Sequence, residues 1–315
     1  MGSERQLRPV AIYFTGLMAL FATLPPTVVS AGSAGSSQSS SSSSQSDADL
    51  AQQLTNPVAN MIQIPFQNNF DLGGGRNNDA SRYTLNVQPI IPFTLDKDWN
   101  LITRTIIPYA NWQGVFPETQ TGLGDIVQSF FISPSATPSG IVWGAGPVFL
   151  YPTATNSVFG GRQWGAGPTF VGLQMNGAWT YGALINHIWS LSKVPGPPAF
   201  AEIGDNNFAI ERQPINATFL QPFVSYTLPT QTTLSLTSES LYDWSAQRWT
   251  VPINVGINQL ISVYGQKMQL GGQIRCYVET PTGGPTWGFQ LRWTLVFPVS
   301  GLSAMENMRS ALVTK

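Results

Sequence analysis

Hydrophobic and polar side chains alternate along most of the chain from about residue 61 onward. The clearest example spans residues 248–258, where polar and apolar residues alternate from one position to the next. Period-two geometry places the two sets on opposite faces of a β-strand. Residues 287–297 repeat the pattern, and both segments carry arginine at a polar position, Arg248 and Arg292. A soluble sandwich would have leucine there, so the second face cannot be a dry core.

This alternation predicts about twelve strands. Short connections alternate with longer ones, which is typical of a bacterial barrel with short periplasmic turns, longer outer loops and an even strand count. Two outer connections, near Ser245 and Thr282, are short and depart from the trend. We expect strands at 61–72, 82–94, 99–109, 124–133, 141–152, 162–174, 178–190, 216–228, 232–243, 248–258, 266–279 and 286–297.

Four of these segments carry aromatic residues ten positions apart. Ten residues at about 3.3 Å each, tilted by about 45°, rise roughly 23 Å, which is close to the apolar band of about 25 Å in an outer-membrane barrel. The spacing therefore predicts membrane-spanning strands with an aromatic girdle at each interface. The pairs are Tyr83 and Phe93, Trp99 and Tyr109, Trp179 and Trp189, and Trp287 and Phe297.

The N-terminus has the pattern of a secretory signal. Arg5 and Arg8 precede an apolar run from Val10 to Leu24 and then small residues, which predicts a cleaved signal peptide over residues 1–31. The run is about fifteen residues long, below the roughly twenty needed to span a membrane as a helix. No later segment is apolar enough for a transmembrane helix, so we expect the mature chain to enter the membrane as strands.

Four further regions follow the signal. Residues 32–46 are nearly all Ser, Gln and Gly, which predicts a flexible linker. Acidic residues followed by Leu and Ala predict a short helix that Asn56 and Pro57 would end, within a periplasmic extension over residues 47–60. We assign residues 61–298 to the barrel and residues 299–315 to a C-terminal tail.

Composition supports a wet interior. Charged residues make up 10% of the 315 residues, against a typical value of roughly a quarter. Amides and hydroxyls supply most of the polarity, and uncharged polar groups are easier to satisfy inside a barrel than ions are. The net charge of −1 gives no indication of nucleic-acid binding. A soluble two-sheet periplasmic protein stays open as an alternative.

Alternation also predicts which charged residues point into the lumen. Two interpretations stay open: a charged pore wall that selects solutes, or a salt-bridged network that satisfies the polar core of a closed barrel. Five of the seven are basic, so a water-filled lumen would favour small anionic or amphiphilic solutes. The inward set is Arg104, Glu239, Arg248, Lys267, Arg275, Glu279 and Arg292, among Gln63, Gln67, Asn86, Gln88, Asn254, Gln269, Gln273 and Gln290.

Catalytic and metal chemistry have little support. His187 is the only histidine, and Ser190, three positions along the strand, would point to the opposite face. If Trp189 faces lipid, His187 does too, near the outer interface. Cys276 is the only cysteine and shares its face with apolar residues, so no ligand cluster is available. We expect no catalytic residue, cofactor site or metal site.

Two local motifs have simple structural interpretations. The sequence Trp-Gly-Ala-Gly-Pro occurs at residues 143–147 and again at residues 164–168. Neither copy precedes a helix, so we interpret the glycines as positions where adjacent strands pack closely rather than as a phosphate cradle. Asp125 follows a glycine-rich loop, where a carboxylate commonly caps a turn.

The segment NPVANMIQIPFQNNFDLGGGRNNDASRYTLNVQPIIPFTLDKDWNLITRTIIPYA (56–110) resembles a family of bacterial outer-membrane proteins grouped with the "MetA-pathway of phenol degradation" and with transporter-like proteins. The likeness extends to GLGD (122–125), LQPFVSYTLP (220–229), RWTVPINVGI (248–257) and WGFQLRWTLVFP (287–298). The resemblance implies a transmembrane barrel with a transport role and no catalytic residues to carry over. The serine-rich linker and the C-terminal tail depart from the family pattern.

The sequence thus favours an all-β, transmembrane, antiparallel up-and-down β-barrel in the outer membrane of a Gram-negative bacterium. Its expected partners are membrane lipid and lipopolysaccharide, and its expected role is a passive route for small or aromatic solutes. Two alternatives stay open: a structural or surface-interaction barrel with a plugged lumen, and an outer-membrane lipid hydrolase that uses His187.

Overall fold

The structure is a computed structural model that describes residues 47–297, apart from residue 76, residues 138–139, residue 157, and residues 194–198, 204–205 and 211–213. The predicted signal peptide, serine-rich linker and C-terminal tail lie outside the described residues. The described residues belong to one compact unit.

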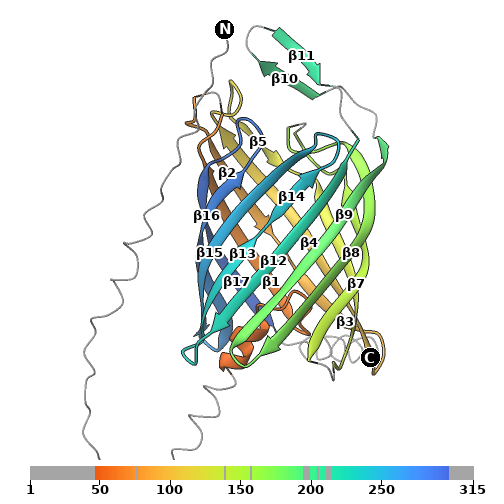
Figure 1. Cartoon of the computed structure of the whole chain (residues 1–315), viewed down its shortest axis with the longest axis vertical. Helices are drawn as coiled ribbons and strands as arrows, with labels where there is room; N and C mark the ends of the chain where they lie inside the picture. The colour runs from red at the N-terminus through yellow and green to blue at the C-terminus, as the bar shows by residue number, and fades with distance from the viewer. Residues whose placement is uncertain are drawn as a thin grey trace, which may run out of the picture. The chain divides into compact units, whose positions relative to one another are not determined.

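The described part of the chain is almost entirely β-structure (Figure 1). The strands are β1 (Ile62–Leu72), β2 (Ser81–Val87), β3 (Ile90–Thr94), β4 (Trp99–Gln113), β5 (Gln120–Leu123), β6 (Ile126–Pro134), β7 (Ile141–Tyr151), β8 (Gln163–Asn176), β9 (Trp179–Lys193), β10 (Ala199–Ile203), β11 (Asn206–Ile210), β12 (Asn216–Thr227), β13 (Thr232–Ser238), β14 (Ser240–Asp243), β15 (Arg248–Val263), β16 (Gln266–Glu279) and β17 (Trp287–Phe297).

Antiparallel pairing between chain neighbours closes these strands into a barrel. The first and last strands, β1 and β17, pair from Ile62 opposite Phe297 to Leu72 opposite Trp287, and β9 pairs with β12. The pairs β2–β3, β5–β6 and β13–β14 are single strands with a short interruption, so the wall has 12 strands. Closure leaves no unpaired edge in the wall, which is what a strand needs in lipid.

The predicted strands are confirmed, with differences at several strand ends and in one connection. β4 and β15 run further than expected, to Gln113 and Val263. The long connection after β9 contains a hairpin, β10 with β11, where the sequence analysis had only a loop. Short turns gather at the lower end of Figure 1, and most longer connections lie at the upper end.

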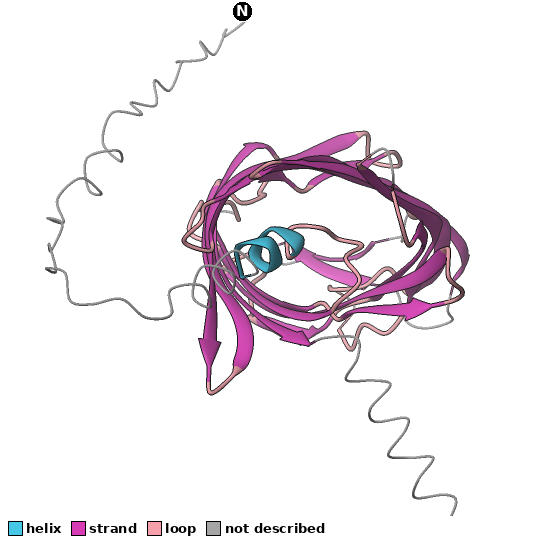
Figure 2. Cartoon of the chain, turned by 90° about the horizontal axis from the view of Figure 1, so that it is seen from below, coloured by secondary structure: helices cyan, strands magenta, loops and turns pink. Residues whose placement is uncertain are grey.

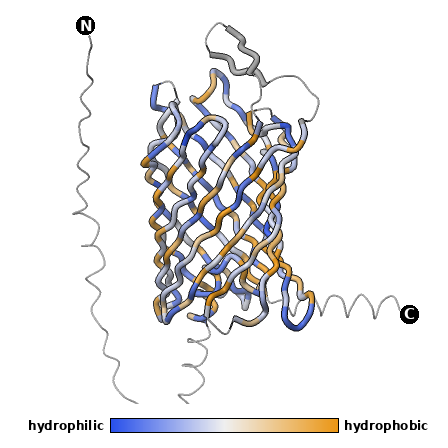
Figure 3. Tube along the Cα trace, turned by 45° about the vertical axis from the view of Figure 1, so that its right-hand side comes forward, coloured by the Kyte–Doolittle hydropathy of each residue, from blue (hydrophilic) through white to orange (hydrophobic). Residues whose placement is uncertain are grey.

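Burial alternates along the strands as the sequence predicted, but polarity is inverted relative to a soluble protein. On β1, the buried positions include Gln63, Gln67 and Asn69, whereas Ile64 and Phe66 lie on the outer face. The same two-residue alternation of hydropathy follows the trace of the other strands (Figure 3). Leucine, isoleucine and tryptophan side chains remain exposed around the wall, which suits an environment of acyl chains rather than water.

One part of the inner wall is apolar. Ile102, Phe131, Val171 and Leu184 are buried in a single cluster on the inner face of β4, β6, β8 and β9. We expected polar groups on this face throughout, and that expectation was wrong for this side. The reason is that an element of the chain itself fills the lumen here.

That element is the segment before β1. Residues 47–53 form a helix, as predicted, and the chain then turns back at residues 54–60. Viewed along the barrel axis, the helix lies within the ring of strands (Figure 2). We refer to residues 47–60 as the plug segment. No helix among the described residues is long and apolar enough to cross a membrane.

Glycines of the repeated motif bring strands close together, as predicted. A Cβ atom at Gly146 would collide with the carbonyl oxygen of Phe130, and one at Gly167 would collide with that of His187. A Cβ at Gly144 would lie 3.1 Å from Phe131 and 3.4 Å from Val58 of the plug segment. These glycines therefore allow close strand packing and leave room for the plug segment.

Candidate functional site

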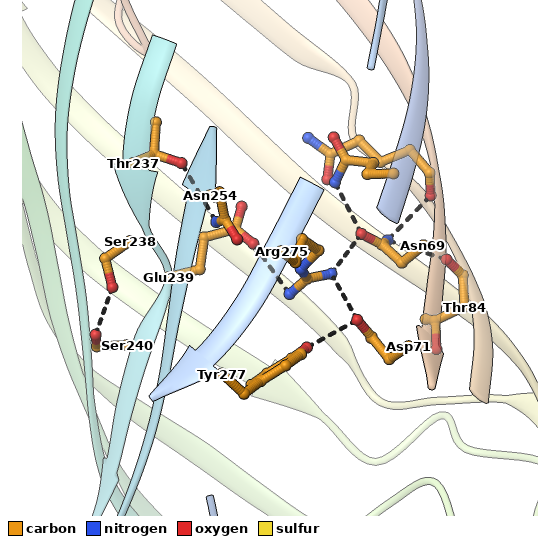
Figure 4. A network of polar contacts seen from close by, with 12 residues as sticks. Asn69, Asp71, Thr84, Thr237, Ser238, Glu239, Ser240, Asn254, Arg275 and Tyr277 are labelled. Atoms are coloured by element: carbon orange, nitrogen blue, oxygen red, sulfur yellow. Dashed lines mark hydrogen bonds and ion pairs between the residues drawn. The ribbon is translucent and has the colours of Figure 1, made fainter. Parts of the chain in front are cut away.

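The upper lumen contains a charged network centred on Arg275 (Figure 4). Its Nη1 lies 3.6 Å from Asp71 Oδ1 and its Nη2 lies 3.5 Å from Glu239 Oε2. Tyr277 donates a hydrogen bond to Asp71 Oδ1 over 2.9 Å, and the guanidinium lies over its ring at 5.6 Å. One cation thus faces two carboxylates that come from β1 and from the junction of β13 and β14.

Amides extend this network across the wall. Arg275 Nη1 and Gln290 Nε2 both donate to Asn69 Oδ1, over 2.7 and 2.8 Å. Asn69 Nδ2 in turn donates to the backbone oxygen of Thr84 over 3.0 Å. These bonds tie β1, β2, β16 and β17 together, so the network stabilises the closed wall near the seam between the first and last strands.

Two further arginines, Arg104 on β4 and Arg292 on β17, lie lower in the lumen. Arg104 Nη2 donates to Gln88 Oε1 over 3.1 Å, and Gln88 Nε2 donates to Gln67 Oε1 over 2.7 Å. Arg292 donates from Nε and Nη2 to Gln290 Oε1, over 3.2 and 3.0 Å. Within the described residues, no carboxylate lies within ion-pair distance of either guanidinium.

Arg104 and Arg292 line the same cavity, which has a volume of about 130 Å³. Gln63, Gln273 and Ser225 also line it. The plug segment closes it on one side with residues 54–57. This partly enclosed cavity is the candidate site for a solute.

The plug segment is held by contacts of three kinds. Val58 is buried in the apolar cluster of the inner wall, and Ala59 packs in a second cluster with Met61 and Val296. Gln52 Nε2 donates to the backbone oxygen of Gly177 over 2.8 Å. Lys267 Nζ forms a 2.6 Å ion pair with Asp47 Oδ2. The extension expected in the periplasm thus packs into the barrel end.

Five of the seven charged residues expected in the lumen fall into three groups. Arg275 and Glu239 meet in the upper network, and Arg104 and Arg292 share the lower cavity. Lys267 binds the plug segment. The other two residues, Arg248 and Glu279, are exposed at the ends of β15 and β16. They take part in none of these three sets of contacts.

The eight girdle residues lie on the outer face, towards the two ends of the strands. Six of them are more than a third exposed: Phe93, Trp99, Tyr109, Trp179, Trp189 and Trp287. Tyr83 and Phe297 are partly buried. At the level of Tyr83, Phe70 stacks with Phe289 at 4.7 Å and contacts Tyr83 at 5.0 Å.

His187 points outward, as its spacing from Trp189 predicted. Its Nδ1 lies 2.7 Å from Thr218 Oγ1, which also accepts a bond from Trp244 Nε1 over 2.8 Å. The imidazole packs on Trp189 with ring centroids 4.1 Å apart. The contacts therefore join His187 to a threonine and two tryptophans, with no hydrogen bond to Ser190 in the described part of the chain.

The remaining candidate residues from the sequence are Asp125 and Cys276. Asp125 accepts backbone N–H bonds from Ala154 and Gly161, over 3.0 and 2.7 Å, and so fixes the loop between β7 and β8 as a turn-capping residue. Cys276 is exposed on the outer face. Over residues 47–297, outside the gaps, no group of three or more His, Cys, Asp or Glu side chains is arranged to hold a metal ion.

Sequence reasoning missed three features of the site. Asp71 and Tyr277 lie at inward positions of predicted strands, so the alternation contained the signal that could have found them. Phe130 and Phe131 are adjacent apolar residues, a pattern typical of a strand buried on both faces. The insertion of Val58 into the barrel had no comparable signal, because it depends on where a distant wall has space.

No protein-family model matches the chain, and no curated protein matches its sequence. Among solved structures, an outer membrane channel from Pseudomonas putida F1 is 14% identical, with a TM-score of 0.56 over 75% of this chain and 94% of that chain. At this identity the likeness shows a shared fold. The fold is that of an outer-membrane β-barrel.

Two other structures are similar at lower scores. The β-domain of the Bordetella autotransporter Brka is 9% identical, with a TM-score of 0.42 over 75% of this chain and 99% of that one. Outer membrane phospholipase A from Escherichia coli is 10% identical, with a TM-score of 0.38 over 74% and 88% of the two chains. These scores are too low to support an argument about this protein.

Proposed function

We propose that this protein is a passive outer-membrane channel of a Gram-negative bacterium, secreted by means of its signal peptide, that gives small solutes a route across the membrane. The observation that carries the proposal is a polar cavity inside a closed barrel, bounded on one side by a short segment of the same chain. The fold shared with an outer membrane channel and the sequence resemblance to proteins linked with phenol degradation both support it. Small aromatic solutes are the class that this resemblance favours.

The outer face supports the location and the partners. Apolar side chains and two levels of aromatic residues surround the barrel, which suits contact with acyl chains and with lipopolysaccharide at the interfaces. Closure of the wall gives hydrogen-bond partners to backbone N–H and C=O groups, which lipid cannot provide.

Conductance across a planar bilayer tests the channel. The change Val58→Asp places a carboxylate against Phe131 and Val171, where it has no partner, so the plug segment should leave the lumen. We expect discrete openings whose conductance is several-fold larger than in the wild type. Leu95→Asp is the matched control, because it adds the same charge at an exposed position in the lower β3–β4 turn.

A plugged structural barrel is the second candidate, and the burial of Asn56, Val58 and Ala59 favours it. Correctly folded wild-type and Val58→Asp proteins that both show no discrete openings would reject the channel and support this candidate. The two outcomes are separable because far-ultraviolet circular dichroism confirms the barrel independently of conductance.

We assign no enzymatic activity to the chain. His187 bonds to Thr218 rather than to a serine nucleophile, and within the described residues its Nε2 has no hydrogen-bond partner. The expectation is checked with phospholipid and lipopolysaccharide substrates. Hydrolysis by the wild type that His187→Ala abolishes would contradict it.

A further inference from the structure

The lower cavity is lined by hydrogen-bond donors that the protein does not use. Gln63 is 3% exposed, and its Nε2 has no hydrogen-bond partner among the described residues. Gln273 Nε2 on β16 is likewise buried without a partner in the described part of the chain. Both residues line the cavity together with Arg104 and Arg292. Four side chains thus bring N–H groups to one enclosed space.

The described residues that line the cavity supply no carboxylate to accept hydrogen bonds from these donors. No Asp or Glu is among the described residues that line the cavity. The bonds that Arg104 and Arg292 make go to neutral amide oxygens of Gln88 and Gln290. A buried guanidinium paired only with neutral groups keeps its full charge, and each of the two has donors beyond those bonds.

The comparison with Arg275 shows that this is not a general property of the lumen. Arg275 is flanked by Asp71 and Glu239 within 3.6 Å, so the protein supplies its counter-charge. Among the described residues, the lower pair has no carboxylate within ion-pair distance, and the charge of Glu239 acts on both guanidiniums only from farther away. An anion that entered would receive charge-assisted bonds, which are about twice as strong as neutral ones. Guanidinium groups also match a carboxylate in planar, two-point geometry.

Part of the cavity lining is apolar. Ile90 and Phe223 line it from the wall, and Leu54 and Pro57 line it from the plug segment. Its volume of about 130 Å³ is close to that of the roughly 150 Å³ apolar cavity known to hold benzene. A ligand that used both surfaces would have one anionic head and a compact hydrophobic body.

We propose that the lower lumen is a binding site for small organic carboxylates with an apolar body, held by Arg104, Arg292, Gln63 and Gln273. The inference deepens the proposed channel function by naming a solute class, and it rests on that function only for the statement that the bound solute is carried. Binding itself can be measured without transport.

Titration calorimetry with benzoate on the full-length protein in detergent tests the site. We expect Arg104→Met and Arg292→Met each to weaken benzoate binding at least tenfold, because methionine keeps the apolar stem and removes the charge. Arg248→Met is the matched control, since Arg248 is exposed at the end of β15 and should leave binding unchanged. Neutral benzamide should bind at least tenfold more weakly than benzoate.

Equal benzoate affinity in the wild type and in both cavity variants would overturn the proposal, as would equal binding of benzamide. Inorganic phosphate or acetate binding as tightly as benzoate would reject the apolar part of the site. If a methionine variant does not fold, Arg104→Lys or Arg292→Lys replaces it, with a smaller loss expected because lysine keeps the charge but not the planar fork.

The outcomes separate this inference from the channel proposal. Discrete conductance without benzoate binding would retain the channel and reject the site. Arginine-dependent benzoate binding by a barrel without openings would retain the site and reject the channel.

Discussion

Arg275 in the upper lumen lies between two carboxylates, whereas the hydrogen bonds of Arg104 and Arg292 to other described residues in the lower lumen go to amide oxygens. The upper cation also has a tyrosine ring beneath it and an asparagine at its edge. The lower pair faces a cavity. The same residue type on the same inner wall therefore has two roles, one that stabilises the wall and one that is available to a ligand.

The difference follows from what surrounds each charge. Burying a charge costs several kcal/mol unless it is paired and hydrogen-bonded. In the upper network the partners come from the wall itself and join strands that are far apart in sequence. In the lower lumen, the plug segment contributes Leu54 and Pro57 to the cavity, and neither can act as a counter-charge.

The largest expected effect is on the upper network. Arg275→Met leaves the partly buried Asp71 and Glu239 without their cation, so we expect the free energy of unfolding to fall by up to about 3–5 kcal/mol. Arg292→Met removes no ion pair and should cost less than about 2 kcal/mol. Denaturant unfolding in lipid vesicles measures both. If both variants lost the same free energy of unfolding, Arg275 in the upper lumen and Arg292 in the lower lumen would not differ in their contribution to stability.

A triple variant sharpens the same comparison. Adding Asp71→Asn and Glu239→Gln to Arg275→Met replaces the two carboxylates with neutral amides. The single change leaves those carboxylates without the cation that separates their charges. We expect about 2–3 kcal/mol of the loss to be recovered, because an uncharged network has no unpaired ion. The same unfolding experiment checks this. A further loss in the triple variant would contradict this explanation, because it would show that the two carboxylates stabilise the wall even without the cation.

The lower region depends on apolar packing of the plug segment. Val58→Ala removes two methyl groups from a buried site against Phe131 and Val171, and should cost about 1–3 kcal/mol of the free energy of unfolding. Val255→Ala on the outer face of β15 is the control, since Val255 is 58% exposed. Openings should also become more frequent in the bilayer experiment with Val58→Ala only.

The smallest effect concerns the ion pair that holds the plug segment. Lys267 and Asp47 are partly exposed, so Lys267→Gln should cost about 0.5–1 kcal/mol. Its effect on conductance should nevertheless exceed that of Lys97→Gln, whose ammonium is exposed and lies 3.9 Å from Asp98. Identical single-channel records for the two variants would contradict a holding role for Lys267.

The alternation of side chains was sufficient to predict the strands, the face of each residue and the outward position of His187 and Cys276. These are local properties, since a period of two residues fixes direction within one strand. The helix over residues 47–53 was likewise predictable from its own residues and from Asn56 and Pro57.

The tertiary structure decided which contacts each inward-facing side chain makes. Arg275 lies 3.6 Å from Asp71 because β1 closes on β17 and β16 pairs beside it, and residues about 200 positions apart then share one face. Arg248 and Arg275 had the same pattern in the sequence, yet one is at the exposed end of its strand and the other is buried. The sequence by itself determined which way each side chain points. Only the closed barrel, with Val58 packed inside it, decided which charges are paired and which face the cavity, because those contacts depend on the register between strands and not on the pattern within one.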